Sequence, residues 1–238
     1  MTAVPTRETE KQGSVQVEQA ILDAARDLLA AGGRAALSMR QVADQVGVSA
    51  TAIYHYFKGK QDLVDRVVLR AFERFGSYLR EAMDSQPEGS VERFAALGDA
   101  YLRFALENEA YFRIMFSMEA KDHAVLEHVP EGGGYHLLRR SVADALAAGT
   151  IRIPRGPAAS RTGLAEQRAA DPDLIAMFLW STVHGLVTLS LCGAADRCHV
   201  AAAPTAIEMY QAFGPMIAHG IRSQQDGRDE SQGEGGVR

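Results

Sequence analysis

Apolar residues recur every three to four positions along most of this chain, the spacing that places them on one side of a helix. Gly, Pro and Asn stand between these stretches and mark helix ends and turns. The pattern therefore predicts an all-α fold. The long helices that it predicts span residues 17–31, 60–83, 90–107, 110–118, 135–148, 173–191 and 204–221.

A hairpin of two shorter helices is predicted between Ser38 and Lys60. Ser38 and Ser49 each precede a helical stretch, where a serine hydroxyl accepts a hydrogen bond from a backbone N–H of the first turn. Gln41, three residues after Ser38, is placed to complete a capping box. Gly47 follows the first helix, where glycine adopts a left-handed turn at no steric cost. We expect the apolar side chains of Val42, Val46, Ile53 and Phe57 to face inward.

The outward positions of the second short helix are Ala50, Thr51, Tyr54 and His55, and none of them is acidic. Two small residues let the helix approach a partner closely, while the larger two offer a hydroxyl and a ring nitrogen. Lysines follow at 58 and 60. A helix that enters the major groove of DNA needs this combination. A plain helical hairpin with a solvated face fits the same residues, so the hairpin alone leaves both interpretations open.

The surrounding residues resemble the DNA-binding part of the TetR family of bacterial transcription regulators. The resemblance rests on AILDAARDLLAAGG at 20–33 and on LSMRQVADQVGVSATAIYHYFKGKQDLV at 37–64. It includes an alanine-rich helix ending in glycine, a Gly-Val-Ser turn and a Tyr-x-x-Phe-x-x-Lys run. One position departs from the family pattern: Ala52 stands where the family often has Thr, with Thr51 beside it.

The resemblance implies a three-helix helix-turn-helix domain, a larger helical ligand-binding and dimerisation domain, and a repressor that binds a pseudo-palindromic DNA operator as a homodimer. A symmetric dimer also follows from the short reach of one recognition helix, since two copies can read two half-sites. The expected boundaries are a disordered arm at 1–16, the DNA-binding domain at 17–62, the regulatory domain at 63–221 and a disordered tail at 222–238. The expected DNA-binding residues are Ser38, Arg40, Ser49, Ala50, Thr51, Tyr54, His55 and Lys60.

The charge of the chain is uneven in a way that suits this expectation. The formal net charge is −5, which would oppose binding to phosphate if it were spread evenly. Residues 1–80, however, carry 11 Lys and Arg against 9 Asp and Glu, whereas residues 81–238 carry 14 against 21. A basic head on an acidic body is consistent with local attraction to DNA.

Trp180 and His184 lie four residues apart and therefore share one face of a helix, with Gly185 beside them. The run WSTVHGL is similar to the Trp-x-x-x-His-Gly signature of one TetR-type regulatory domain. His184 is then either a core histidine with a satisfied hydrogen bond or a polar group at the edge of an effector pocket. The sequence leaves both roles open.

A pocket for an unknown small-molecule effector is expected in the body. The run AYFRIMFSM at 110–118 supplies aromatic and Met side chains that suit an irregular cavity, although the same residues would serve equally as ordinary core. The pocket candidates are Tyr101, Phe104, Phe112, Met115, Met177, Trp180 and His184. Family resemblance implies that the last two long helices build the dimer interface, for which the candidates are Leu186, Leu189, Phe213, Met216 and Ile217.

The sequence gives little support for a metal site, a phosphate-binding loop or an enzyme active site. Cys192 and Cys198 have no metal-ligand spacing, and His123 and His128 are five apart, where a shared helical face needs three or four. The run Gly132–Gly134 lacks the Lys-Ser or Lys-Thr of a phosphate loop. We therefore expect no enzyme, no cofactor and no metal. No leader and no membrane segment are evident, and 174–191 is expected to be a buried helix, so the expected location is the cytoplasm.

One alternative function remains, a helical protein-interaction module without effector binding. Salt dependence separates the two, because binding to phosphate weakens steeply with salt and docking of an apolar surface does not.

Overall fold

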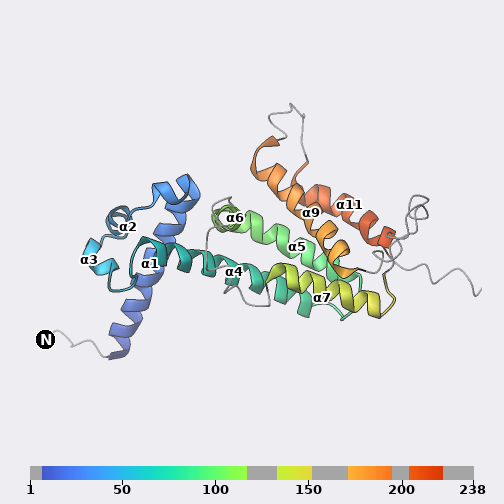
Figure 1. The fold of residues 1–238 in the computed structure, drawn as a ribbon, viewed down its shortest axis with the longest axis horizontal. Coiled ribbons are helices and arrows are strands. Elements are labelled where there is room, and N and C mark those ends of the chain that lie inside the picture. Colours follow the sequence, from blue (N-terminus) through green and yellow to red (C-terminus); the bar gives the residue numbers. More distant parts are fainter. Residues whose placement is uncertain (1–6, 117–132, 152–170, 195–203, 222–238) are drawn as a thin grey trace, which may run out of the picture. The chain divides into compact units, whose positions relative to one another are not determined.

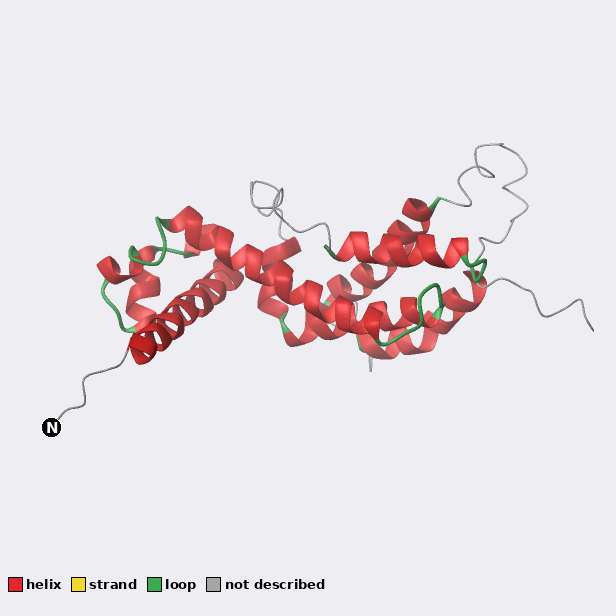
Figure 2. Ribbon diagram, turned by 90° about the horizontal axis from the view of Figure 1, so that it is seen from below, coloured by secondary structure: helices red, strands yellow, loops and turns green. Residues whose placement is uncertain are grey.

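The computed structural model describes residues 7–116, 133–151, 171–194 and 204–221. These residues form helices joined by loops (Figure 2), so the predicted all-α class is confirmed. The helices are labelled in Figure 1. Their bounds are α1 Arg7–Ala36, α2 Met39–Val46, α3 Ala50–Ile53, α4 Lys60–Asp84, α5 Glu92–Glu107, α6 Glu109–Phe116, α7 Gly134–Ala147, α9 Pro172–Leu191 and α11 Ala206–Ile221.

The contacts divide the chain into two compact units. Unit 1 comprises 1–77 and 103–133, and unit 2 comprises 78–102 and 134–238. The helices α4 and α5 each have residues in both units. The sequence analysis places a domain break between 62 and 63, whereas unit 1 continues to residue 77. The first turns of α4 belong to unit 1 because they supply buried side chains such as Leu63, Val64 and Val67 to the same unit as α1.

The core of unit 1 is built where α1, the hairpin and the start of α4 meet. Ile21, Val42, Ile53 and Leu63 lie at 0% exposure and Phe57 at 1%, so the apolar positions predicted to face inward do so, apart from half-buried Val46. Farther along, the rings of Phe75 and Phe104 pack with centroids 5.0 Å apart, and α6 packs on α1. The hydrophobic effect of this burial holds the hairpin to its supporting helices.

The core of unit 2 joins α5, α7 and α9. Val91, which directly precedes α5, Phe94 of α5, Val142 of α7, and Ile175 and Ala176 of α9 form one buried cluster. The helix α9 packs against both α7 and α11. At its start, the Asp171 side chain accepts from the Asp173 backbone N–H, and Asp173 accepts hydrogen bonds from Tyr135 and Arg139 of α7. These contacts fix the entry of α9 against α7.

Two boundaries differ from the sequence expectation. The helix α1 begins at Arg7, so residues 7–16 are helical where the sequence predicts a disordered arm. The backbone leaves helical geometry at Gly32 and Gly33, as predicted, and Gly33 has a φ of 64°. The helix α3 covers only Ala50–Ile53, shorter than expected. His123, His128, Cys198 and the tail 222–238 lie outside the described residues.

The helix α9 passes a length and composition test for a membrane span, with a mean hydropathy of 1.7, although only 22% of that window is buried. Its buried positions include Ile175, Ala176, Val183 and Val187. Four large apolar side chains on α9 remain exposed: Leu174, Met177, Phe178 and Leu189. The expectation of a buried helix is therefore only half met, because one face of α9 packs inside this chain and the other does not.

Candidate nucleic-acid interface and buried cavity

The first helix of the hairpin, α2, is capped at both ends. The Ser38 hydroxyl accepts from the Gln41 backbone N–H at 3.2 Å and donates to the Gln41 side-chain oxygen at 2.7 Å. The capping pair is thus formed through the two side chains. Gly47 has a φ of 78°, and its backbone N–H donates to the Ala43 carbonyl at 2.9 Å. A side chain at Gly47 would be strained in this left-handed conformation. The turn is therefore fixed by local chemistry.

The second helix, α3, begins at a serine cap and is followed directly by a turn with three-residue hydrogen-bond spacing. The Ser49 hydroxyl accepts from the Ala52 backbone N–H at 3.1 Å. The chain then leaves the α-helix after Ile53, and the backbone N–H groups of His55 and Tyr56 donate to carbonyls three residues earlier. This tighter 3₁₀-type turn carries the donor-bearing side chains Tyr54 and His55. The sequence did not reveal this change of helix type.

The outer face of the hairpin is exposed as predicted. Ala50, Thr51 and His55 are exposed, and Tyr54 retains 56% of its surface. Arg40 and Ser49 are also exposed, while Ser38 and Lys60 are half-buried. All eight predicted DNA-binding residues therefore keep accessible surface. The face combines a slim leading edge with hydroxyl and imidazole groups, which suits hydrogen bonding to phosphate and base edges.

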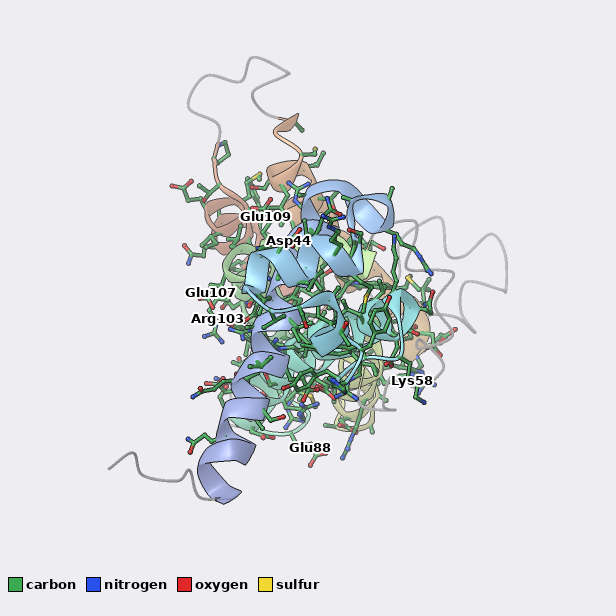
Figure 3. All side chains as sticks on the ribbon, turned by 90° about the vertical axis from the view of Figure 1, so that its left-hand side faces the viewer. Asp44, Lys58, Glu88, Arg103, Glu107 and Glu109 are labelled. Carbon is green, nitrogen blue, oxygen red and sulfur yellow. The ribbon has the colours of Figure 1, made fainter. Side chains whose placement is uncertain are left out.

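Two cations flank this face at the start of α4. The backbone N–H of Lys58 donates to the Asp62 carboxylate at 2.7 Å, which ties the loop after α3 to the first turn of α4. In Figure 3, the side chains of Lys58 and of Asp44, an exposed acid on α2, project from separate places on the hairpin. Asp44 therefore does not lie beside Lys58.

Ion pairs hold α1 against α4 behind the hairpin. Arg66 contacts Glu18 at 2.9 Å and Arg70 contacts Asp23 at 3.2 Å. Arg26 also contacts Asp23, and its guanidinium lies 5.4 Å from the centroid of the Tyr111 ring on α6. Each exposed pair contributes little alone. Together the ion pairs and the Arg26–Tyr111 contact join α1 to both α4 and α6. A movement of α6 would therefore be transmitted to α1, the helix that supports the hairpin.

In unit 2, Trp180 and His184 meet Tyr101 of α5. The Tyr101 hydroxyl lies 2.7 Å from His184 Nδ1 and accepts from Trp180 Nε1 at 3.4 Å. Burial lowers the pKa of His184 below its usual 6.5 and raises the pKa of Tyr101. A neutral imidazole with an unprotonated Nδ1 can then accept a hydrogen bond from the tyrosine hydroxyl. This geometry matches the core-histidine interpretation, since the polar atoms of His184 and Tyr101 pair with each other.

A separate cavity of about 370 Å³ lies in unit 2 among α5, α7, α9 and α11. Most of its wall is apolar, with contributions from Phe94, Leu138, Leu179 and Val183. Tyr210 of α11 lines one part of this cavity. Its hydroxyl donates to two backbone carbonyls of α5, at 3.3 Å for Ala95 and 3.5 Å for Phe94. A Cβ atom on Gly98 would collide with the Tyr210 ring. Glycine at position 98 is what lets Tyr210 reach these carbonyls.

None of the seven predicted pocket residues lines this cavity. Tyr101, Trp180 and His184 form their own cluster. Phe104, Phe112 and Met115 are buried in unit 1, and Met177 is 46% exposed. Helical periodicity marks which side chains are buried, but it does not show where space remains between them. A glycine inside an apolar helix, as at Gly98, was the sequence signal of a close approach.

The predicted dimer residues lie on the two helices expected. Leu189 is 56% exposed, Phe213 61% and Met216 67%, while Leu186 and Ile217 are half-buried. Ile217 also lines the cavity. Large apolar side chains exposed together on neighbouring helices are typical of a surface that another molecule covers.

Two family models match the chain. Residues 21–67 match "Bacterial regulatory proteins, tetR family", and residues 94–212 match "Tetracyclin repressor-like, C-terminal domain". The chain belongs to the TetR family. The resemblance inferred from the hairpin is thus confirmed, and the second match extends it to the helical body.

Named relatives agree. Over 80 residues the chain is 35% identical to the HTH-type transcriptional repressor KstR2 of Rhodococcus jostii, a match that spans 33% of this chain and 38% of that protein. A structure of a protein of unknown function from Rhodococcus sp. RHA1 is 27% identical, with a TM-score of 0.67, over 87% of this chain and 96% of that one. The family and its named members regulate transcription, so this TetR-family chain is a transcription regulator and not an enzyme.

Two further structures share the fold at 17% identity. The regulator FadR of Bacillus subtilis in complex with stearoyl-CoA has a TM-score of 0.63 and matches 86% of this chain and 99% of its own. A regulator from Saccharomonospora viridis in complex with choline has a TM-score of 0.65 and matches 88% of this chain and 100% of its own. At this identity the likeness concerns the fold alone.

Proposed function

We propose that this TetR-family regulator is a ligand-responsive repressor that binds a pseudo-palindromic DNA operator as a homodimer in the bacterial cytoplasm, where it joins the nucleoid when bound. The observation that carries this proposal is the outer face of the capped hairpin. Ala50 and Thr51 leave room for a close approach to bases, while Tyr54 and His55 offer hydrogen bonds. The acid-free face and the flanking lysines support contact with phosphate.

The homodimer is supported by the outer surface of α9 and α11. Exposed Leu189, Phe213 and Met216 would cost free energy in water, and a second copy of the same surface would cover them. Phe178, which is 56% exposed on α9, is a further candidate that the sequence interpretation did not include. Two-fold pairing would present two hairpins, which matches the symmetry of a pseudo-palindrome.

Effector control is supported by the cavity in unit 2. Two proteins of this fold hold small molecules, stearoyl-CoA in one case and choline in the other. An effector changes DNA affinity only by its difference in affinity for two conformations. We propose that the bound effector favours a conformation in which the two hairpins are wrongly spaced, with a coupling of about 1–3 kcal/mol.

The test is selection of duplexes from a random pool, followed by mobility-shift assays of the selected site at several salt concentrations. The proposal predicts a selected site with two inverted halves. It also predicts an affinity that falls roughly a thousandfold or more as salt rises from about 50 to about 200 mM. A chain that selects no duplex, or whose binding ignores salt, would instead support the protein-interaction module.

A further inference from the structure

The cavity in unit 2 has a mainly apolar wall. Its lining includes Phe94 and Leu97 of α5, Leu138 of α7, and Leu179 and Val183 of α9. Such a wall favours a ligand with an apolar body, because burial of apolar surface is non-directional and scales with area. The wall therefore sets the body of the ligand, and the few polar groups along it set the functional group.

Thr182 of α9 is one of these polar groups, and it is half-buried. Its hydroxyl donates to the Phe178 carbonyl one helical turn earlier, at 2.9 Å. A hydroxyl has a single proton and two lone pairs. With the proton engaged in this bond, the Thr182 oxygen meets a ligand as a hydrogen-bond acceptor.

Tyr210 of α11 meets a ligand in the same way. Its hydroxyl donates to the carbonyls of Ala95 and Phe94, so the oxygen keeps lone pairs and has no second proton to give. Burial is the main cause that raises the pKa of Tyr210 to about 12, and the phenol therefore keeps the proton that it donates. The wall thus already seats one hydroxyl donor, in the space above Gly98.

A third acceptor comes from the backbone of α11. Pro215 lies inside this helix and has no N–H, so the carbonyl of Gln211, four residues earlier, lacks the donor that an α-helix normally supplies. Both residues line the cavity. The Gln211 side chain can donate, but it is exposed, where water competes for it. The half-buried part of the polar lining therefore offers acceptors.

Charged groups give no counterpart for an anion. Among the described residues that line the cavity there is no Lys, Arg or His. The two acids of the lining, Glu92 and Asp99, are exposed and have interaction partners within the protein. A carboxylate placed among the apolar side chains would lose its water without gaining a cation, which is unfavourable.

We infer that the cavity takes a neutral alcohol or phenol with an apolar body, and prefers it to ethers, esters and carboxylates of the same size. This inference rests on the proposed effector function of the cavity and names the class of that effector. A ligand hydroxyl recovers in the cavity the hydrogen bond that it gives up in water. A ligand that only accepts leaves the acceptors of the wall without a donor.

Matched probes test this inference directly. Octanol and heptyl methyl ether are isomers, and only the oxygen of octanol carries a proton. Calorimetric titration of the full chain, below the solubility limit of each probe, gives the affinity and the stoichiometry. We expect one octanol per chain, bound about threefold to tenfold more tightly than the ether, because one net hydrogen bond separates the two. Octanoate should bind more weakly than octanol.

Three results would overturn the inference. The first is equal or tighter binding of the ether, which is expected if the wall offers only apolar contact. The second is tighter binding of octanoate than of octanol. The third is the absence of saturable octanol binding.

Paired variants show whether the named acceptors cause the preference. Thr182→Val removes a hydroxyl and keeps the side-chain shape, and Pro215→Ala restores the N–H that pairs with the Gln211 carbonyl. Together they should lower the ratio of octanol affinity to ether affinity at least about twofold. Thr188→Val with Pro204→Ala is the control, because it makes the same chemical changes at exposed positions that do not line the cavity. An unchanged ratio in the first pair, or an equal fall in the control, would contradict the inference.

A mobility-shift assay on the selected duplex, with and without octanol, separates this inference from the proposed function. A chain that binds its duplex but shows no preference for octanol loses only the inference. A chain that binds octanol as expected but selects no duplex, or whose DNA affinity ignores octanol, loses the proposed effector control and keeps its ligand class.

Discussion

Two aromatic side chains in different units are exposed to nearly the same degree: Tyr54 on the hairpin at 56% and Phe213 on α11 at 61%. Tyr54 is surrounded by small and hydrogen-bonding residues, such as Thr51 and His55, and carries its own hydroxyl. Phe213 lies with Met216 on one helix, and neither of these two exposed side chains offers a hydrogen-bond donor.

The comparison shows that exposure alone does not define the role of a surface. The hairpin buries its apolar positions within one chain and leaves a polar face that hydrogen-bonds to water and that the proposed operator would contact. The α9 and α11 surface leaves apolar area in water, which is unfavourable in a single chain. One surface is polar and solvated, whereas the other exposes apolar side chains that the proposed homodimer would cover. The predictions below test this difference.

The largest effect is expected from Phe57→Ala. Phe57 is 1% exposed in the core of unit 1, and truncation of a buried Phe costs about 3–5 kcal/mol because a cavity remains. Urea unfolding followed by circular dichroism measures the loss. Tyr54→Ala on the outer face should change stability by no more than about 0.5 kcal/mol. Equal destabilisation by the two variants would show that the hairpin packs differently.

Phe213→Asp should break the dimer. A buried apolar contact at the centre of an interface is worth about 2 kcal/mol or more, and two-fold symmetry applies the change twice. Light scattering across protein concentration measures the shift toward the monomer. Tyr54→Asp is the matched control, because it places the same charge at an equally exposed aromatic position without affecting assembly. A Phe213→Asp protein that remains dimeric would remove α11 from the interface.

Changes on the outer face of the hairpin should affect DNA binding in two ways. Tyr54→Ala and Lys60→Ala should weaken binding to all duplexes alike, with Lys60→Ala reducing the salt slope by about 1, because these residues are predicted to contact phosphate. Thr51→Ala should relax the preference at one base position, at a cost of about 1–3 kcal/mol for the selected site if it reads a base. Mobility-shift assays on a panel of single-base variants distinguish the two patterns.

Loss of the Ser49 cap should cost about 1 kcal/mol, because the Ala52 backbone N–H loses its acceptor. Ser49→Ala would be measured by urea unfolding. Ser49→Gly serves as the control, since glycine at this position costs only a few tenths of a kcal/mol relative to serine. If alanine costs no more than glycine, the cap does not stabilise α3.

The smallest effect concerns pH. Burial lowers the folded-state pKa of His184, so the unfolded chain binds the proton more readily as pH falls below the usual 6.5. The stability that His184 contributes is therefore present above pH 6.5 and is lost as pH falls toward the lowered pKa. His184→Asn should flatten this part of the curve of unfolding temperature against pH.

The sequence predicted the hairpin well because its determinants are local. Ser38, Gly47 and Ser49 act through backbone groups within four residues of themselves, so their roles follow from the order of residues alone. The inward positions Ile53 and Phe57 followed from helical periodicity. The switch to a tighter turn after Ile53 was missed, since the residues at 54–56 suit either helix type.

The body was harder to predict because its cavity depends on distant residues. Gly98 and Tyr210 are more than a hundred positions apart, and only their packing shows that the missing side chain of one accommodates the ring of the other. The apolar pattern of α9 was also ambiguous, because a helix buried within its own chain and a helix covered by a partner both require apolar residues. The short helical start of α1, at 7–16, has too few apolar residues for periodicity to reveal it.

The central claim is that two hairpins, held by one dimer, read two half-sites at a fixed separation. The direct measurement is the affinity of the full chain for its selected duplex before and after insertion of about five base pairs, half a helical turn, between the halves. The account predicts that two chains bind the original duplex and that the insertion abolishes this binding by turning one half-site to the opposite side. An affinity that is unchanged by the insertion would contradict it.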